Sequence, residues 1–247
     1  MKYIRYIFFI LTLFLLTPAV TIILALLRIF NLAWTFGGHI SKLWANVLLF
    51  SSGVKVQIFG MENIHPHNKY IFISNHLSHF DSVILQGKLP SKYRFLAKRE
   101  LFRIPFFGWA LSLAGHIKVD RGEGSLQKIL DQAKNVLEKK GASIHFFAES
   151  TRSTDGMIYP FKPGAFILAR ETGVPIIPMG ILGTRDVLPK GALLPRPAHA
   201  IISVGKPFQV SDDGSGLIEI LENARKTVAA LSGQELGTTR PKSSHKS

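Results

Sequence analysis

The chain of 247 residues contains no cysteine. This absence excludes disulfide bridges, thiolate metal sites and a catalytic cysteine nucleophile. It fits a reducing compartment. A Gly-x-Ser-x-Gly sequence is also missing, which argues against a serine hydrolase of the α/β-hydrolase type.

Acidic residues are scarce and unevenly distributed. None occurs before Glu62, and none lies in residues 82–99, whereas both stretches carry lysine and arginine. The formal net charge of the chain is +14. A surface with this charge attracts polyanions, so nucleic acid and anionic lipid are both candidate partners.

The N-terminal segment decides between these partners. Residues 6–27 carry no charge. At about 1.5 Å per residue, a helix of this length reaches about 33 Å, against a hydrocarbon core of about 30 Å. The run is longer than the apolar part of a usual signal peptide, and no convincing cleavage site closes it. We therefore expect a membrane-anchoring helix and no nucleic-acid partner.

Residues 29–50 form a second, less hydrophobic segment that carries Trp34 and Trp44. Tryptophan is typical of the boundary between water and lipid, and we expect both rings there. The two segments form either one span followed by an interfacial helix or a helical hairpin. A hairpin would break near residues 28–31 or at Gly37-Gly38.

The positive-inside rule favours the hairpin. Lys2 and Arg5 argue for a cytoplasmic N-terminus, and a hairpin keeps the basic remainder of the chain on the same side. The expected location is therefore a membrane, on the cytoplasmic face of the inner (plasma) membrane if the source is bacterial.

The rest of the chain alternates between strand and helix patterns. The expected strands cover residues 54–59, 70–74, 115–119, 143–148, 176–182 and 198–204. The expected helices cover residues 125–140, 163–172 and 216–231, with a broken helix at 99–114. This order predicts a single α/β layered domain with a mostly parallel or mixed sheet flanked by helices. The expected division is a membrane-anchoring segment 1–52, a domain 53–233 and a polar, disordered tail 234–247.

The strand at residues 70–74 leads into a loop with His76, and Asp81 follows five residues later. A histidine next to a carboxylate is a general-base arrangement, although this spacing alone is common in proteins. His79 leaves a metal site open as an alternative, with two imidazoles and one carboxylate. No strong cluster of further ligands occurs elsewhere, so we expect no metal.

Two further strands end in charged loops. One ends in Asp120-Arg121, and the other leads to Glu149 and Arg152. Each loop can be a solvated turn with a surface ion pair that contributes little to stability. Alternatively, the arginines bind an oxyanion or a phosphate group. A fourth segment, residues 174–178, is an apolar strand bracketed by prolines and is core on its own.

Together, the order and spacing of these segments resemble the lysophospholipid and glycerolipid acyltransferase family, in particular the 1-acyl-glycerol-3-phosphate acyltransferases. The similarity covers roughly residues 54–208. Its blocks are Asn-His-x-x-x-x-Asp at 75–81, an apolar residue with Asp-Arg at 119–121, Phe-Pro-Glu-Gly-Thr-Arg-Ser at 147–153 and Val-Pro-Ile-x-Pro at 174–178.

The third block departs from the family pattern at two positions. Ala148 replaces a proline and Ser150 replaces a glycine, whereas Glu149 and Arg152 are kept. If this glycine has a positive φ in the family, Ser150 is strained there or the loop takes another path. These departures concern the choice of substrate more than activity.

The resemblance implies a reaction. A fatty acyl group passes from an acyl thioester to the free hydroxyl of lysophosphatidic acid, which gives phosphatidic acid in phospholipid biosynthesis. His76 is then the general base, Asp81 orients its imidazole, and no covalent enzyme intermediate forms. The family needs no cofactor, because acyl-CoA or acyl carrier protein supplies the acyl group as co-substrate.

The resemblance also implies substrate contacts, at Lys98, Arg121, Glu149, Ser150, Thr151 and Arg152. Arg121 and Arg152 match the positions that bind the head group, and Glu149 orients Arg152 or bonds the glycerol. Lys98 is expected near the phosphate or the developing oxyanion. Residues 101–113 and the N-terminal helices are expected to line an apolar groove for the acyl chain.

Two alternatives stay open. The chain is an acyltransferase for another lyso-lipid acceptor, such as a lyso-aminolipid, because the altered third block leaves room for one. Or it is a non-catalytic protein that binds anionic lipid, which the presence of both His76 and Asp81 disfavours. All these hypotheses predict membrane lipids with an anionic surface as partners.

Overall fold

The computed structural model describes residues 2–90, 92–119, 125–189, 191–210 and 216–238. Within these residues, seven strands form one sheet in the order β1-β7-β6-β2-β5-β3-β4. The strands are β1 (Lys55–Phe59), β2 (Ile71–Ser74), β3 (Tyr93–Lys98), β4 (Ile117–Val119), β5 (Ser143–Phe147), β6 (Ile176–Leu182) and β7 (His199–Val204). Only the β6–β7 pair among these is antiparallel, so the expected α/β class with a mixed sheet is confirmed.

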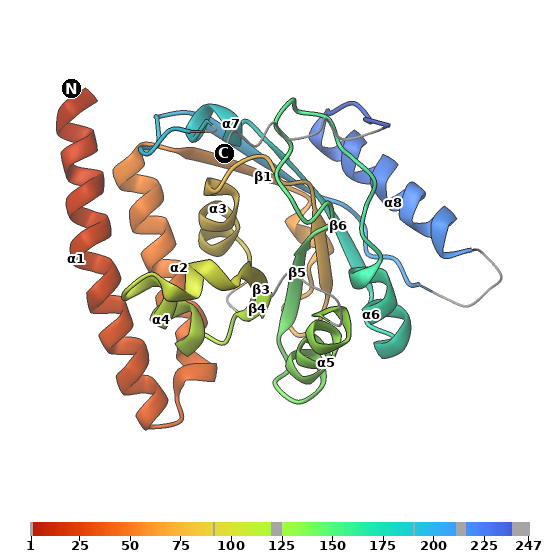
Figure 1. The fold of residues 1–247 in the computed structure, drawn as a ribbon, viewed down its shortest axis with the longest axis horizontal. Coiled ribbons are helices and arrows are strands. Elements are labelled where there is room, and N and C mark those ends of the chain that lie inside the picture. Colours follow the sequence, from red (N-terminus) through yellow and green to blue (C-terminus); the bar gives the residue numbers. More distant parts are fainter. Residues whose placement is uncertain (1, 91, 120–124, 190, 211–215, 239–247) are drawn as a thin grey trace.

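Helices cover both faces of the sheet (Figure 1). They are α1 (Lys2–Ile29), α2 (Ala33–Ser52), α3 (Phe80–Lys88), α4 (Phe107–Leu113), α5 (Ser125–Glu138), α6 (Gly164–Thr172), α7 (Thr184–Val187) and α8 (Leu217–Ser232), with 3₁₀ turns η1 (Met61–Asn63) and η2 (Arg99–Arg103). Strand β2 shows the two-sided burial. Ile71 and Ile73 pack with α5, α6 and α8, whereas Phe72 packs with α2 and α3 on the other face.

The first two helices form the expected hairpin. Helix α1 ends at Ile29 and α2 begins at Ala33, and Asn31 between them has a φ of 57°. The break near residues 28–31 is therefore confirmed, and the alternative at Gly37-Gly38 is wrong because both glycines lie inside α2. The segment Tyr3–Ile29 is long and apolar enough to cross a membrane.

The two tryptophans of α2 contact cationic or polar partners on neighbouring elements. Trp34 contacts two cations, with the Arg94 guanidinium carbon 4.6 Å and the Lys140 Nζ 5.4 Å from the centroid of its ring. Trp44 donates from its indole Nε1 to the Thr17 hydroxyl at 3.1 Å. Both rings thus join α2 to neighbouring elements, and their expected position at the lipid boundary stays a prediction.

The sequence predicted a disordered tail from residue 234, but the first residues of this segment are ordered. Residues 234–238 lie against the domain, where Leu236 forms a β-bridge with Ile158. The buried guanidinium of Arg225 donates to the carbonyl oxygens of Ile158, at 2.9 Å, and Gly237, at 2.5 Å. These bonds fix the segment. Residues 239–247 lie outside the described part of the chain, and the division at residues 52 and 53 stays a prediction.

Candidate active site

The polar segments singled out in the sequence follow the ends of adjacent strands. Strand β2 leads to His76, β5 leads to residues 148–153, and β3 ends at Lys98. Because β2, β5 and β3 are parallel neighbours, these segments meet at one edge of the sheet. In open α/β sheets, ligands bind outside the carboxyl ends of the strands, so this edge is the expected place for a site.

His76 and Asp81 form a hydrogen-bonded pair. The His76 Nδ1 lies 2.8 Å from the Asp81 Oδ2. The same oxygen accepts the backbone N–H groups of Leu77, at 2.7 Å, and Ser78, at 2.9 Å. Asp81 is fully buried in the first turn of α3, where the helix dipole favours a negative charge. The carboxylate therefore holds the proton of the imidazole on Nδ1 and leaves Nε2 as the proton acceptor.

Aromatic rings fix the plane of the imidazole. His76 stacks on Phe147, with ring centroids 3.8 Å apart and an interplanar angle of 16°. His145 meets the same phenyl ring edge-on at 4.6 Å. The His145 Nε2 lies 2.9 Å from the Ser74 hydroxyl, which itself donates to the Asn75 carbonyl, so Nε2 carries the proton. Burial, with a smaller effect of His76, lowers the pKa of His145 to about 3, and this histidine is neutral at pH 7.

Cationic side chains act on the neighbouring His79. Burial lowers the pKa of His79, and the charges of Arg152, His76 and Lys98 lower it further, whereas Asp81 raises it. These couplings place Arg152 and Lys98 in the neighbourhood of His79, and their role in binding the substrate stays a prediction. Burial also lowers the pKa of Arg152, and Asp81 opposes this effect. The site thus offers positive charge beside a proton acceptor, which suits a phosphate-bearing substrate.

The loop after β5 shows how the two unusual residues are accommodated. The backbone N–H of Ala148 donates to the Ser74 carbonyl at 3.0 Å, a bond that proline cannot make. Ser150 has a φ of 60°, so it takes the left-handed conformation instead of another path. Glu149 is 2 % exposed, and its carboxylate accepts the backbone N–H of Tyr159 at 3.0 Å. Ser150 and Thr151 are exposed at the surface.

Further hydrogen bonds position the first block. The Asn75 side chain forms two hydrogen bonds with the backbone of Ile181. Its amide group donates to the Ile181 carbonyl at 2.7 Å, and its Oδ1 accepts the Ile181 N–H at 2.8 Å. Its amide also donates to Gln234, which in turn donates to the Gly156 carbonyl. The Ser153 N–H bonds the His76 carbonyl at 2.8 Å. Gln234 was missed in the sequence, because no local pattern signals a partner 159 residues away.

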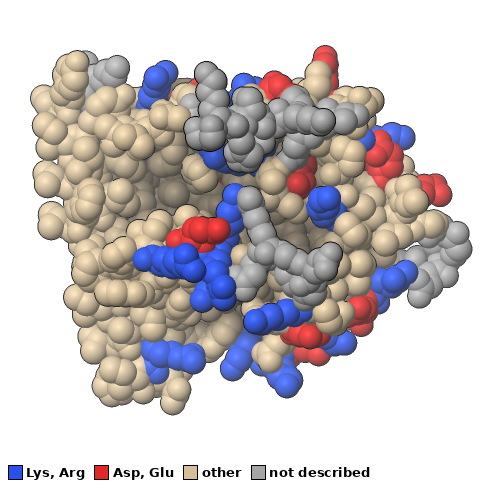
Figure 2. All heavy atoms as spheres, viewed as in Figure 1, with Lys and Arg blue, Asp and Glu red and all other residues tan. Residues whose placement is uncertain are grey.

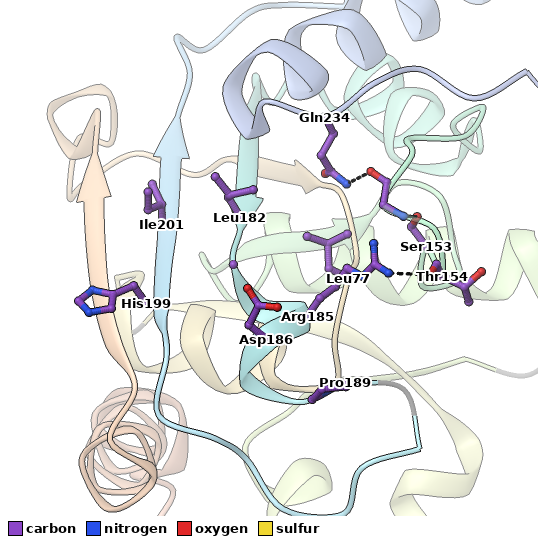
Figure 3. A pocket seen from close by; sticks show the side chains of 12 residues that line it. Leu77, Ser153, Thr154, Leu182, Arg185, Asp186, Pro189, His199, Ile201 and Gln234 are labelled. Carbon is purple, nitrogen blue, oxygen red and sulfur yellow. Dashed lines mark hydrogen bonds between the residues drawn. The ribbon is translucent and has the colours of Figure 1, made fainter.

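Two cavities flank the first block. An apolar cavity of about 320 Å³ is lined from α1, α2, η2 and α4, and His79 reaches it. Residues of the expected acyl groove, such as Leu101 and Leu111, line it as predicted. A second cavity of about 700 Å³ lies on the β6–β7 side. There Arg185 points to the Thr154 carbonyl, and Gln234 points to the loop that contains Ser153 (Figure 3).

The described residues contain no group of three or more His, Asp or Glu side chains placed to hold a metal ion. The Asp81 Oδ2 is already bonded to His76 and two backbone N–H groups. The expectation of no metal and no cofactor stays a prediction. Arg121, the other expected head-group ligand, lies outside the described part of the chain.

Comparison with known proteins agrees with the chemistry that the geometry of the site suggests. A chloroplastic 1-acyl-sn-glycerol-3-phosphate acyltransferase of Brassica napus is 39% identical over 160 residues, which cover 64% of this chain and 45% of that protein. The 1-acyl-sn-glycerol-3-phosphate acyltransferase of Pseudomonas aeruginosa is 29% identical over 196 residues, which cover 78% of this chain and 75% of that protein. The chain thus spans about half the length of the chloroplastic relatives that it matches.

The fold has a counterpart among solved structures. The crystal structure of the 1-acyl-sn-glycerophosphate (LPA) acyltransferase PlsC from Thermotoga maritima matches with a TM-score of 0.65 and 24% identity. The match covers 93% of this chain and 95% of that protein. The model of the Acyltransferase family matches residues 55–182, which include the His76–Asp81 pair and the loop after β5. This match spans more than half of the sequence, so the chain belongs to the acyltransferase family.

Proposed function

We propose that this protein transfers a fatty acyl group from an acyl thioester to the free hydroxyl of lysophosphatidic acid and so forms phosphatidic acid. The observation that carries the proposal is the buried Asp81 carboxylate, which orients His76 beside Arg152 and Lys98. Family membership supports acyl transfer. The names of the relatives support lysophosphatidic acid as the acceptor.

The chemistry follows from the pair. An alcohol is a poor nucleophile near neutral pH, so a base must remove its proton as the oxygen attacks the thioester carbonyl. The His76 Nε2 accepts this proton, and Asp81 stabilises the imidazolium that results. When the tetrahedral intermediate collapses, the C–S bond breaks and the thiolate leaves. The imidazolium returns its proton to the sulfur, so the enzyme ends unchanged and no acyl-enzyme forms.

The acceptor phosphate binds the cations of the site. Arg152 and Lys98 supply positive charge from the described residues, and Arg121 is proposed as a further ligand on the basis of the sequence motif alone. Glu149 is buried and accepts the Tyr159 backbone N–H, which supports a role in holding the loop that carries Arg152 more than a direct bond to the glycerol. The exposed Ser150 and Thr151 are then the outermost contacts of the head group.

The proposal also says where the acyl chain binds and how the protein attaches to the membrane. The apolar cavity lined by Trp44, Leu101 and Leu111 takes the acyl chain, since it is reached by His79 from the first block. Helix α1 holds the protein at the cytoplasmic face of a membrane that contains anionic lipid. Acyl-CoA or acyl carrier protein approaches from the aqueous side. The net charge of +14 supports association with an anionic surface.

The proposal is tested by incubating the purified full-length protein with lysophosphatidic acid and either acyl-CoA or acyl carrier protein thioester. Lipid analysis should detect phosphatidic acid. His76→Ala should lower the rate by about 10²–10⁴, the usual contribution of a general base. His67→Ala, which changes an exposed histidine outside the site, should leave the rate unchanged. Full activity of His76→Ala would show that the mechanism is wrong.

A second candidate acceptor has a specific observation in its favour. Ala148 and Ser150 change the β5 loop that presents Arg152, so the head-group site differs locally from the family pattern. The same assay should therefore offer a lyso-aminolipid in parallel. Faster turnover of that acceptor would reassign the substrate and keep the mechanism. Lipid binding without turnover of any acceptor would identify a non-catalytic lipid-binding protein.

A further inference from the structure

The turn between η2 and α4 presents large apolar side chains to solvent. Ile104 is 45 %, Phe106 is 40 % and Trp109 is 54 % exposed. The rings of Phe106 and Trp109 contact each other edge-on, with centroids 5.1 Å apart. The neighbouring Phe102 and Phe107 pack inward against the buried core. The apolar residues of the turn therefore form two sets. The inner set, Phe102 and Phe107, stabilises the fold, and the outer set, Ile104, Phe106 and Trp109, does not.

The backbone of this turn is strained in a way that exposes an aromatic ring. Phe106 has a φ of 60° and a ψ of −57°, and the N–H of Phe107 donates to the Pro105 carbonyl at 2.6 Å. This is a γ-turn with positive φ, a rare and strained conformation. Glycine would adopt it at lower cost. A phenylalanine at this position is explained if its ring has a partner outside the chain.

The outer set continues the apolar surface of α1. The Thr21 hydroxyl of α1 donates to the Phe106 carbonyl at 3.0 Å, which holds the turn beside the helix. Helix α1 itself exposes large apolar side chains along its length, among them Leu11, Phe14 and Ile22. Figure 2 shows a broad area over α1 with few charged side chains. One continuous apolar surface of this kind suits a bilayer better than a small ligand.

Basic side chains border this surface on the side of the active site. Arg103 at the end of η2 and Lys118 on β4 are exposed, and the Lys118 Nζ lies 5.2 Å from the Phe102 ring. Arg99 lies in the same turn, with Glu100 as its acidic neighbour. Figure 2 shows Lys and Arg side chains gathered with an acidic one near η2. The local charge is thus net positive, as binding to anionic head groups requires.

We propose that Ile104, Phe106 and Trp109 insert into the head-group region of a bilayer that contains anionic phospholipid, with Arg103 and Lys118 at the level of the phosphates. Aromatic side chains are favoured at this depth, and lysine and arginine attract the negative surface. This contact is a second attachment point beside α1. It rests on the proposed function, because it places the entrance of the acyl cavity at the lipid surface.

The test uses Trp109 as a reporter in the full-length protein. The protein is reconstituted into phosphatidylcholine vesicles with or without phosphatidylglycerol, which carry a quencher at the head group. The difference between wild type and Trp109→Phe isolates the signal of Trp109 from those of Trp34 and Trp44. We expect the Trp109 emission to be quenched, and more strongly when phosphatidylglycerol is present.

Two sets of variants separate lipid contact from folding. Phe106→Gly relieves the γ-turn, so its melting temperature should equal or exceed that of the wild type. Its turnover of vesicle-borne substrate should nevertheless fall several-fold, while turnover of monomeric short-chain substrates stays unchanged.

The double variant Arg103→Gln with Lys118→Gln should reduce the stimulation by phosphatidylglycerol, by about fivefold per charge at most. Lys226→Gln on α8, at the far end of the molecule from α1, is the matched control (Figure 1).

The outcomes distinguish this inference from the proposed function. If Trp109 is not quenched although the protein floats with the vesicles, the inference is wrong and α1 alone attaches the protein. If Trp109 responds to acyl carrier protein but not to vesicles, the surface binds an acidic protein and the inference is again wrong. If the wild type turns over no substrate, the proposed function fails, and the quenching result still decides the lipid contact.

Discussion

At the scale of single residues, Asp81 sets the tautomer of His76. Its Oδ2 accepts the backbone N–H groups of Leu77 and Ser78 and the Nδ1–H of His76. In Asp81→Asn, the amide oxygen would take the place of Oδ2, because two backbone N–H groups donate there, and the NH₂ group would take the place of the buried Oδ1. A neutral amide oxygen accepts the Nδ1 proton more weakly than a carboxylate and carries no charge to stabilise the imidazolium that forms. We expect the acyl-transfer rate to fall by about 10²–10⁴.

The measurement for Asp81→Asn is the steady-state rate with saturating lysophosphatidic acid. A fluorescent-lipid binding assay serves as its control, since the variant should still bind the acceptor. A variant that keeps more than about a tenth of the wild-type rate would contradict the role given to Asp81, because the loss would fall below the range expected for a base.

Phe147 is a second residue whose role follows from geometry. Its ring stacks on His76 at 3.8 Å, so it faces the imidazolium when the proton is transferred. A cation–π contact of this kind contributes about 0.5–2 kcal/mol. We predict that Phe147→Leu lowers kcat by about 2- to 30-fold, whereas Phe147→Trp, which keeps an aromatic face, retains most of it. Equal losses of kcat in both variants would mean that only the shape of the packing matters.

Ser150 gives a prediction about stability. At a φ of 60°, a residue with a Cβ costs about 1–2 kcal/mol, and the extra chain entropy of glycine offsets part of any gain. Ser150→Gly should therefore stabilise the protein by on the order of 1 kcal/mol, which thermal unfolding can detect. Ser150→Ala keeps the Cβ and should not be stabilised. A lower melting temperature for Ser150→Gly would show that the hydroxyl has a structural role.

The residues that could be predicted from sequence are those whose partners are close in the chain. His76 and Asp81 lie within one loop and its helix, so their pairing follows from the motif. The stacking of His76 on Phe147 depends on the pairing of β2 with β5, which sequence spacing does not reveal. The cation partners of Trp34 could not be predicted for the same reason, since they come from β3 and the segment that follows α5.

At the scale of elements, the long amphipathic or apolar segments were predictable and the short packed ones were not. Helix α3 has nine residues, its N-cap His79 makes no side-chain capping bond, and Gly87 lies near its end. Such a segment is marginal as an isolated helix. It forms because it packs closely on α2, where a Cβ added at Gly87 would lie only 3.0 Å from the Leu49 side chain. Helix propensity therefore did not predict α3 from the sequence. The helix forms because of its tertiary contacts with α2.

The segment after α8 gives a testable case at this scale. Gln234 links Asn75 to Gly156 and so ties the end of the chain to the first block. Gln234→Ala removes both side-chain bonds and leaves buried polar groups without their partner, which costs about 1–3 kcal/mol. Urea unfolding measures this loss. Gln209→Ala, an exposed loop position, is the control and should be neutral. Equal stability of both variants would show that the segment contributes nothing to the site.

At the scale of the whole molecule, buried neutral histidines couple folding to pH. Burial, with a smaller effect of His76, lowers the pKa of His145 from 6.5 to about 3. Desolvation, with a smaller effect of Arg94, places the pKa of His116 well below 6.5. Between these values and pH 6.5, the unfolded chain binds more protons than the native chain. The free energy of unfolding therefore falls as the pH falls through this window.

We accordingly predict that the protein loses about 2 kcal/mol of stability per buried histidine between pH 7 and pH 5. Burial raises the pKa of Asp155, but its hydrogen bonds together lower that pKa below 3.8, so this carboxylate contributes a loss only at more acidic pH. His145→Gln can still donate to the Ser74 hydroxyl but binds no proton. Urea unfolding at pH 7, 6 and 5 should show a shallower pH dependence for this variant, by about one proton. Parallel curves for variant and wild type would mean that His145 is protonated in the folded protein.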